Sequence, residues 1–600
     1  MLRSSALRYL VLLGLWPGLF LYAQAPAAKT TAPPRSATQH PPGPASASST
    51  PAAPAAGAAA SGPGLTAAAI IDTMARQEKQ LYQMMKSYHP VVETYIQDFR
   101  LDPVLGDVPI SDHYYLGQLD YSHGYAQDQT YLNHPGWGMG ILSAVSHFYS
   151  LHYLSAGFVD MLFPDPMRFD RAHYYFKYLR QDFLGNVRCY VFNVRPKPGV
   201  HGAFLGRIWV EARQKHLVRF NGTFVPQPLF SRYFHFDSWR INARPGLWVP
   251  AFVYSEESDI KGSTMFGLAG HTRFGAETRI WGYGLEIAHH ASTASQMIVE
   301  GAVQDRSSGA DAYSPVVAER MWQREAEDNV LHRMQKAGLL APPGPVDKTL
   351  EQVVNNLEIT NHLNIQPHVR CRVLLVTPMV VFNIGHTIVI SRGLVDVLPN
   401  EATLATMLAH GLAAIVKGMP IDTKFAFYDR MLIPDDKVFT QFRLQHTPKQ
   451  ETLINTETVQ LMQNSPYESK LASVGLFLEA MNARAQVLPH LMGPNFIGNP
   501  LIHNGKVQGL GPLLRNAPKL QFANVKQIEA LPLGSRLQVQ PWLDQVEMFK
   551  APPVTLLSAA EKMPFQVTPQ RPYLQRNQFQ MAATGSVSAT PSSDTSDITH

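Results

Sequence analysis

A helical pattern of apolar residues begins just after residue 65. Apolar side chains recur there every three or four positions, which places them on one face of a helix. They are Ile70, Met74, Leu81, Met84 and Met85. Thr66 is suited to cap the helix N-terminus, and His89-Pro90 ends the pattern. We therefore predict a helix over residues 65–86 whose apolar face packs on a core.

From about residue 170 to residue 300 the pattern changes to short runs rich in aromatic and β-branched residues. Turn signals such as KPGVHG and ARPG separate these runs. The runs are RCYVFNVR (188–195), FLGRIWVEA (204–212), HLVRFNGTF (216–224), SRYFHFDSW (231–239), LWVPAFVYSEE (247–257) and TRIWGYGLEI (278–287). Successive short strands with tight turns predict an antiparallel meander, as a barrel or a curved sheet.

The apolar residues of these strands raise the question of a ligand-binding face. Alternation along the strands groups them on shared sides. They are Tyr190, Phe192 and Val194 on one strand, with Ile208, Val210, Phe234 and Phe236 on others. An aromatic face left open would mark a binding site. Alternatively, the same rings pack together in a closed interior. We predict the open face.

The C-terminal half returns to helical periodicity. A helix is expected over 313–338, and the breaker APPGP (341–345) separates it from a second helix in VDKTLEQVVNNLEITNHL. RCRVLLV (370–376) and HTIVIS (386–391) are typical of two strands of a small sheet. A third helix follows, with Asn400 as its N-cap and Glu401 in its first turn.

The two ends of the chain have a different character. Arg3 and Arg8 lie at the start of an apolar run that ends near YAQA, and this charged, apolar, small-residue order is that of a secretory signal. An uncleaved membrane anchor is the alternative. Residues 26–64, rich in Ala, Pro, Ser and Thr, are expected to be a disordered tether, and residues 566–600 a low-complexity tail. The signal predicts a periplasmic or secreted protein.

Composition narrows the class of protein. The chain has 600 residues, of which 45% are hydrophobic and 16% charged, as in folded proteins with substantial cores. Its net charge of +5 comes without a long Lys/Arg run, so nucleic-acid binding is not expected. Cys189 and Cys371 are expected to be buried thiols without a disulfide.

The segment TMLAHGLAAIVKG (406–418) resembles the metal-binding helix of zinc proteases. That helix carries H-E-x-x-H, in which two histidines bind zinc and the glutamate acts as general base. Here His410 occupies the first position, Gly411 replaces the glutamate and Ala414 replaces the second histidine. Since a catalytic zinc needs about three protein ligands and a base, we expect no hydrolysis. Another histidine, His386, His446 or His490, could complete a site.

The order of elements around this helix strengthens the resemblance. Residues 346–490 are similar to the zinc metalloendopeptidase family that includes the CAAX prenyl protease, HtpX and BepA, with a strand, GLV, a capped helix and a later helix in the same order. The family's third zinc ligand is a glutamate in a Glu-Ala-Asp pattern. Glu468 matches that ligand, Lys470 stands at the Asp position, and Val380-Val381 replace the family's Asn-Ala. His410 and Glu468 are thus vestigial ligand positions.

The N-terminal half carries a looser resemblance. FLGRIWVEARQKHLVRFNGTF (204–224) is similar to a strand–turn–strand of LolA-like lipoprotein-carrier domains, which form an antiparallel half-barrel closed by helices. Together the two resemblances imply an α+β protein. Its expected parts are a signal peptide (1–25), the tether, a LolA-like domain (65–310), a mostly helical metallopeptidase-like domain with a small sheet (311–565) and the tail.

The function expected from these parts is an exported pseudo-peptidase that acts in binding, as a scaffold or an envelope quality-control protein. Its partner would be a polypeptide or an apolar, lipid-like ligand, and membrane association and oligomeric state stay open. No cofactor is expected. The alternatives are an active zinc endopeptidase with a non-standard site, which would require zinc, and a carrier of lipid or lipoprotein.

Overall fold

The computed structural model describes residues 66–102, 106–121, 127–128, 158–200, 203–225, 233–259, 272–283, 315–419 and 446–492, with short stretches between 502 and 576. All of these residues belong to one compact unit, Leu65–His600. The predicted signal peptide and the whole of the tether lie outside the described residues. Among the described helices none is long and apolar enough to cross a membrane.

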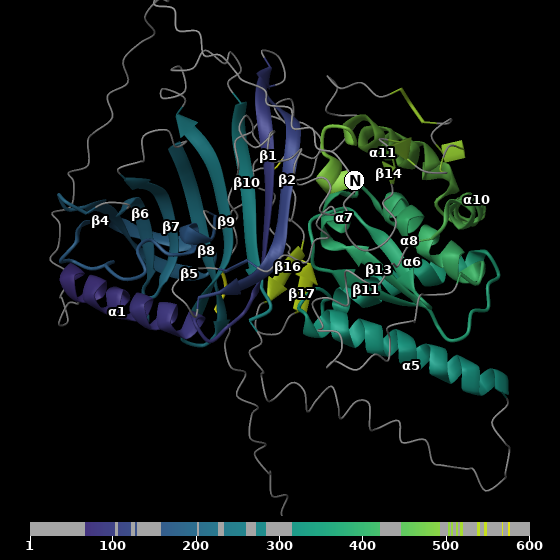
Figure 1. Ribbon diagram of the computed structural model, residues 1–600, viewed down its shortest axis with the longest axis horizontal. Helices are drawn as coiled ribbons and strands as arrows, with labels where there is room; N and C mark the ends of the chain where they lie inside the picture. Colours follow the sequence, from purple (N-terminus) through teal and green to yellow (C-terminus); the bar gives the residue numbers. More distant parts are fainter. Residues whose placement is uncertain are drawn as a thin grey trace, which may run out of the picture. The chain divides into compact units, whose positions relative to one another are not determined.

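A large antiparallel sheet dominates the N-terminal half (Figure 1). Its strands follow the order β3-β2-β1-β10-β9-β8-β7-β6-β5-β4, so it is open, with β3 and β4 at its edges. The bounds are β1 Val91–Asp102, β2 Gly106–Asp120, β3 Gln127–Asp128, β4 Tyr174–Leu184, β5 Val187–Pro196, β6 Ala203–Glu211, β7 Leu217–Val225, β8 Tyr233–Arg244, β9 Leu247–Asp259 and β10 Thr272–Trp281. The fold is therefore α+β, and the strands predicted between 188 and 257 correspond to β5–β9.

Four strands of this sheet, β1 to β4, were not predicted from the sequence, and β10 begins at Thr272, before the predicted run 278–287. β1 is buried on both faces, because Val91 and Tyr95 point into one core while Val92 and Ile96 point into another. Polar residues of β1 are buried as well, which removes the alternation that identifies an amphipathic strand. β2 pairs with β1, and β1 pairs with the distant β10, so that Val91 lies opposite Trp281.

Helix α1, Ala67–Met85, covers one face of the sheet. Thr66 caps it, as predicted, since its hydroxyl accepts a hydrogen bond from the Ala69 backbone N–H at 3.3 Å. The predicted apolar positions Ile70, Met74, Leu81 and Met85 are buried and share a core with β1 and with β5–β10. A buried ion pair between Glu78 of α1 and Arg240 of β8 adds a polar link.

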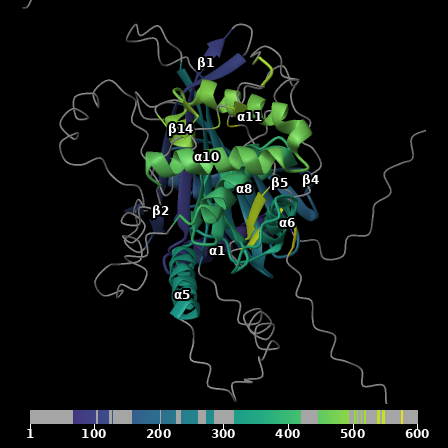
Figure 2. The same ribbon diagram turned by 90° about the vertical axis from the view of Figure 1, so that its right-hand side faces the viewer.

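A small three-stranded sheet forms the C-terminal half together with several helices. β11 Arg370–Leu374 and β13 Thr387–Ser391 pair in parallel, and β12 Val381–Ile384 pairs antiparallel with β13. The helices are α5 Pro315–Lys336, α6 Pro345–Thr360, α7 Arg392–Val397, α8 Glu401–Val416, α10 Pro448–Gln463, α11 Leu471–Arg484 and α12 Pro489–Met492. Of these, α5, α6, α8, α10 and α11 are seen in Figure 2. The predicted strands 370–376 and 386–391 are thus present as β11 and β13. Cys189 and Cys371 are buried free thiols.

Buried polar contacts join the C-terminal half to β1 and β2. The Glu93 carboxylate accepts hydrogen bonds from the Thr377 backbone N–H (2.6 Å), the Thr377 hydroxyl (2.8 Å) and the Tyr114 hydroxyl (2.8 Å). Burial raises the pKa of the Glu93 carboxyl, and Arg279 and the Thr377 hydrogen bonds oppose the rise. On β2, Asp112 accepts bonds from the His490 and Leu491 backbone N–H groups at 3.1 and 2.8 Å. These contacts fix the start of α12 against the sheet.

Residues near the C-terminus also reach the sheet. The Val567 backbone N–H donates to Gln97 Oε1 at 2.8 Å, and the Leu574 carbonyl accepts from the Asn186 N–H at 3.0 Å. Val567 and Leu574 are buried, although both fall in the range 566–600 that composition assigns to the tail. At least this part of the range packs on the fold.

Candidate functional site

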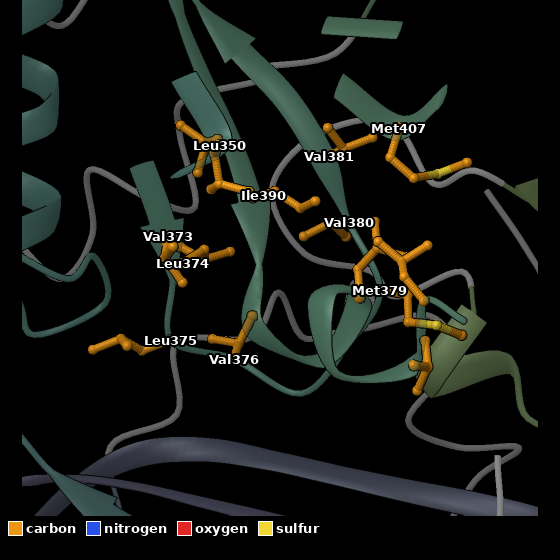
Figure 3. Close-up of a cluster of buried hydrophobic side chains, with 14 of the residues drawn as sticks. Leu350, Val373, Leu374, Leu375, Val376, Met379, Val380, Val381, Ile390 and Met407 are labelled. Carbon is orange, nitrogen blue, oxygen red and sulfur yellow. The ribbon is translucent and has the colours of Figure 1, made fainter. Parts of the chain in front are cut away.

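Helix α8, which carries the peptidase-like segment, is buried along most of its length. Asn400 caps it as predicted: its side chain accepts a hydrogen bond from the Thr403 N–H, and the Thr403 hydroxyl interacts in return with the Asn400 backbone. Glu401 lies in the first turn, as expected, and its carboxylate accepts a hydrogen bond from the Tyr467 hydroxyl at 2.8 Å. In Figure 3, Met407 of α8 lies beside Val381, one of the two valines at the family's Asn-Ala position. Both valines are buried.

Gly411 stands where α8 packs closely on the small sheet. A β-carbon at this position would lie 2.7 Å from Ile388 Cγ2 and 2.9 Å from Ile388 Cγ1. Real β-carbons essentially never approach so closely, and Ile388 is a fully buried residue of β13. Glycine at position 411 therefore has a packing role of its own, because the absence of a side chain allows α8 to contact β13 closely.

Ala414, at the position of the second histidine, is also buried, with an exposed fraction of 1%. Restoring the motif by Gly411→Glu together with Ala414→His would thus insert two large polar side chains into a packed core. The packing at Gly411 predicts that this double change disrupts the contact between α8 and β13.

His410 is engaged by a residue that the sequence did not single out. Its Nε2 lies 3.2 Å from Oε2 of Glu451, in the first turn of α10. The other oxygen, Oε1, lies 3.3 Å from Nδ1 of His446. All three side chains are largely buried, with exposed fractions of 10% for His410, 16% for Glu451 and 13% for His446. The carboxylate thus holds one imidazole on each oxygen.

In this arrangement His410 takes part in a hydrogen bond with a carboxylate. An ionised carboxylate oxygen only accepts, so beside ionised Glu451 the His410 nitrogen that faces it is the donor of this hydrogen bond. The two imidazoles also approach different oxygens of Glu451. Within the described ranges, no three His, Cys, Asp or Glu side chains are grouped so that they could hold a metal ion.

Glu468, the other predicted ligand position, lies in a different environment. It begins the short 3-10 turn Glu468–Lys470, and both Glu468 and Lys470 are exposed. The other two histidines named from the sequence each lie close to a carboxylate of another residue. His386 lies 3.5 Å from Glu327 Oε1, and His490 lies 2.9 Å from Asp112 Oδ1. The Asp112 hydrogen bond raises the pKa of His490.

Glu451 could have been suspected from one local signal. The sequence Thr447-Pro448-x-Gln450 has the form of a capping box with proline in the first turn, and the structure shows Thr447 as the N-cap of α10. A carboxylate at Glu451 is then favoured by the helix dipole. Its contact with His410 joins two helices whose connection lies outside the described residues, and no sequence rule identifies it.

The face of the large sheet that α1 covers is filled rather than open. Aromatic rings interlock there: Phe204 packs edge-on against Phe220 at 5.6 Å and lies 6.2 Å from Phe169, and Phe220 packs against Phe236 at 5.8 Å. Phe192, Val194, Ile208 and Val210 are buried in the same core, and Tyr190 packs against it.

Two glycines make room on this face for the ring of Phe204. Gly206 of β6 and Gly222 of β7 lie opposite each other, and a β-carbon on either would come within 3 Å of the Phe204 ring. Phe204 therefore occupies the space above both. The prediction of an open ligand face fails for these residues, because ring-to-ring packing uses the apolar surface that a ligand would need. The side chain of Phe234 lies outside the described part.

Comparison with known proteins adds a limited finding. The sequence matches no protein-family model, and it matches no curated protein. Among solved structures it matches the crystal structure of the LolA superfamily protein NE2245 from Nitrosomonas europaea, at 12% sequence identity and a TM-score of 0.17, over 36% of this chain and 92% of that one. At this TM-score and identity the match carries no conclusion about the fold or the function of this chain.

Proposed function

We propose that the protein is a non-catalytic binding protein, in which a peptidase-like helical part supports a large sheet and polypeptide is held without being cut. The observation that carries the proposal is the contact between Gly411 and Ile388. The position that supplies the general base in the peptidases is used here for packing. The hydrogen bond between His410 and Glu451 supports the same reading, since it occupies the one retained histidine of the motif.

The edge strand β4 is the surface best suited to a polypeptide. It lies at one end of the strand order of the described sheet and runs over 11 residues, whereas β3 at the other end has 2. Tyr175, Tyr178 and Phe183 on β4 are 48%, 45% and 65% exposed. A long edge strand offers backbone groups to an added strand, and exposed rings supply contacts for its side chains.

The lipid-carrier alternative has less support from the described residues. A carrier needs an apolar space for an acyl chain, and the face beneath α1 is packed with aromatic rings whose exposed fractions are near zero. Binding along the sheet edge requires no such space. We therefore favour polypeptide over lipid as the ligand class.

The experiment is a combined binding and cleavage assay with fluorescently labelled unfolded casein. We expect the anisotropy to rise saturably, and the casein to stay intact on a gel with zinc added. Phe183→Glu together with Tyr178→Glu should weaken binding severalfold. Ile359→Glu on α6, where the isoleucine is 63% exposed, is the matched control and should not. Casein fragments that disappear with His410→Ala, or an absence of saturable binding, would overturn the proposal.

A further inference from the structure

Four basic side chains gather on the outer face of the sheet, opposite to α1. They are Lys177 on β4, Arg195 on β5, Lys197 just after β5 and Arg207 on β6. Register explains the cluster. Tyr175 pairs with Arg195, and Asn193 pairs with Lys177 on one side and with Arg207 on the other. Neighbouring residues such as Phe176 and Val194 point to the α1 core, so these point away from it.

This basic face, defined by Lys177, Arg195, Lys197 and Arg207, has no acidic counterpart. Among the described residues none of the four forms an ion pair with a carboxylate. Asp237, two strands beyond Arg207, is held by both arms of Arg219 at 2.7 Å. The face therefore keeps its positive charge available to an external partner.

Apolar side chains lie among the cations. The Tyr175 ring has the Arg195 guanidinium 5.1 Å and the Lys197 ammonium 5.3 Å from its centre, and it is 48% exposed. Leu205 of β6, which points to the same side, is 37% exposed. Exposed cations mixed with a tyrosine and a leucine suit a boundary where charge meets hydrocarbon.

The N-terminal segment enters the fold beside this face. Asp72, near the start of α1, accepts two hydrogen bonds from Arg171 at 2.7 and 2.8 Å. The carbonyl of Arg171 accepts in turn from Lys197 Nζ at 2.8 Å. The start of α1 is thus linked by hydrogen bonds through Arg171 to Lys197 of the basic face.

We propose that the basic face docks on the surface of a bilayer that contains anionic phospholipid. Charge complementarity selects this occupant, and the exposed Tyr175 and Leu205 favour it over an acidic peptide. Each Lys or Arg near such a surface increases partitioning roughly fivefold. Loss of three of them should therefore weaken the anionic-lipid component about a hundredfold.

The test is co-flotation of the full chain with vesicles of phosphatidylcholine alone or of phosphatidylcholine with phosphatidylglycerol. The apolar N-terminal run would bind both, so the readout is the ratio between the two lipids. We expect a preference for phosphatidylglycerol that fades as salt rises. The preference should vanish in the Lys177→Gln, Arg195→Gln, Arg207→Gln variant while binding to phosphatidylcholine stays unchanged.

The matched control removes the same charge elsewhere. Lys348, Lys449 and Lys470 are exposed lysines of the C-terminal half, and their triple change to glutamine should keep the preference. Arg207→Lys should also keep it. The proposal is wrong if the wild-type protein shows no preference, if both triple variants lose it equally, or if soluble polyglutamate is bound and phosphatidylglycerol is not. Melting temperatures check that every variant is folded.

Discussion

The change Gly411→Ala tests whether α8 packs as closely on the small sheet as the structure indicates. In a mid-helix position, alanine stabilises a helix by about 1 kcal/mol relative to glycine. The new β-carbon would lie 2.7 and 2.9 Å from two carbons of the buried Ile388 side chain. Overpacking of this kind costs about 1–3 kcal/mol. The net result should be a loss of about 0–2 kcal/mol in the free energy of unfolding.

The effect of Gly411→Ala on the free energy of unfolding should change from destabilising to stabilising when Ile388 is replaced by alanine. Ile388→Ala removes both contacting carbons and by itself costs about 2–5 kcal/mol. In that background the new β-carbon at position 411 would not clash with the side chain at position 388. Alanine would also favour the helix and fill part of the cavity left by the isoleucine. It should therefore stabilise by about 1 kcal/mol or more. The cycle of four proteins isolates the contact between the two side chains.

Urea unfolding followed by circular dichroism measures all four free energies. Thr456, exposed on α10, supplies the control: comparing Thr456→Ala with Thr456→Gly gives the helix-propensity term of this protein without a packing term. Stabilisation by Gly411→Ala in the wild-type background, by as much as the Thr456 pair differs, would refute the close contact. The explanation for the missing glutamate would then fail as well.

Three further changes probe other buried polar groups. Burial raises the pKa of the Asp347 carboxyl to about 6. The charged carboxylate therefore lowers the free energy of unfolding above pH 6, and this free energy should rise as the pH falls from about 6 towards 4. Asp347→Asn should raise the free energy of unfolding at pH 7 by up to about 3 kcal/mol and flatten this dependence; destabilisation at pH 7 would contradict it. Thr377→Val removes a hydroxyl that donates to Glu93 at 2.8 Å and should cost about 2 kcal/mol in urea unfolding; a change below about 0.5 kcal/mol would count against the buried network. His410→Ala should cost about 1–3 kcal/mol, because Glu451 loses one partner, and leave casein binding unchanged; a binding defect at full stability would speak for a direct role.

Local signals predicted much of the secondary structure. Thr66 and Asn400 were identified as helix caps because a capping hydrogen bond depends on a few neighbouring residues. β5–β9 follow one another in space as they do in the sequence, so alternation and turn residues located them. β11 and β13 were located from their own runs of β-branched residues, although β12 was not predicted and the order β11-β13-β12 departs from the chain order.

The features that escaped prediction depend on distant contacts. Glu93 and Gln97 are polar yet fully buried, because β1 lies between two cores and its polar groups find partners far along the chain, Thr377 and Val567. The filled sheet face depends on Phe204 covering Gly206 and its neighbour, a fit that periodicity cannot distinguish from an open groove.

The motif itself shows the limit of the sequence. The motif sequence shows that Gly411 has no carboxylate to act as general base. Only the structure shows that Ile388 fills the space beside Gly411. The sequence likewise left three histidines as candidate ligands. The fold pairs His446 with Glu451, His386 with Glu327 and His490 with Asp112.

The central claim is that α8 serves packing and not hydrolysis. The most direct measurement is a zinc titration of the purified chain by calorimetry, run in parallel on the His410→Ala variant, with zinc per chain counted after dialysis. The account predicts well under one zinc per chain and the same weak heats for both proteins. One tightly held zinc per wild-type chain, lost in the His410→Ala variant together with cleavage of casein, would contradict it.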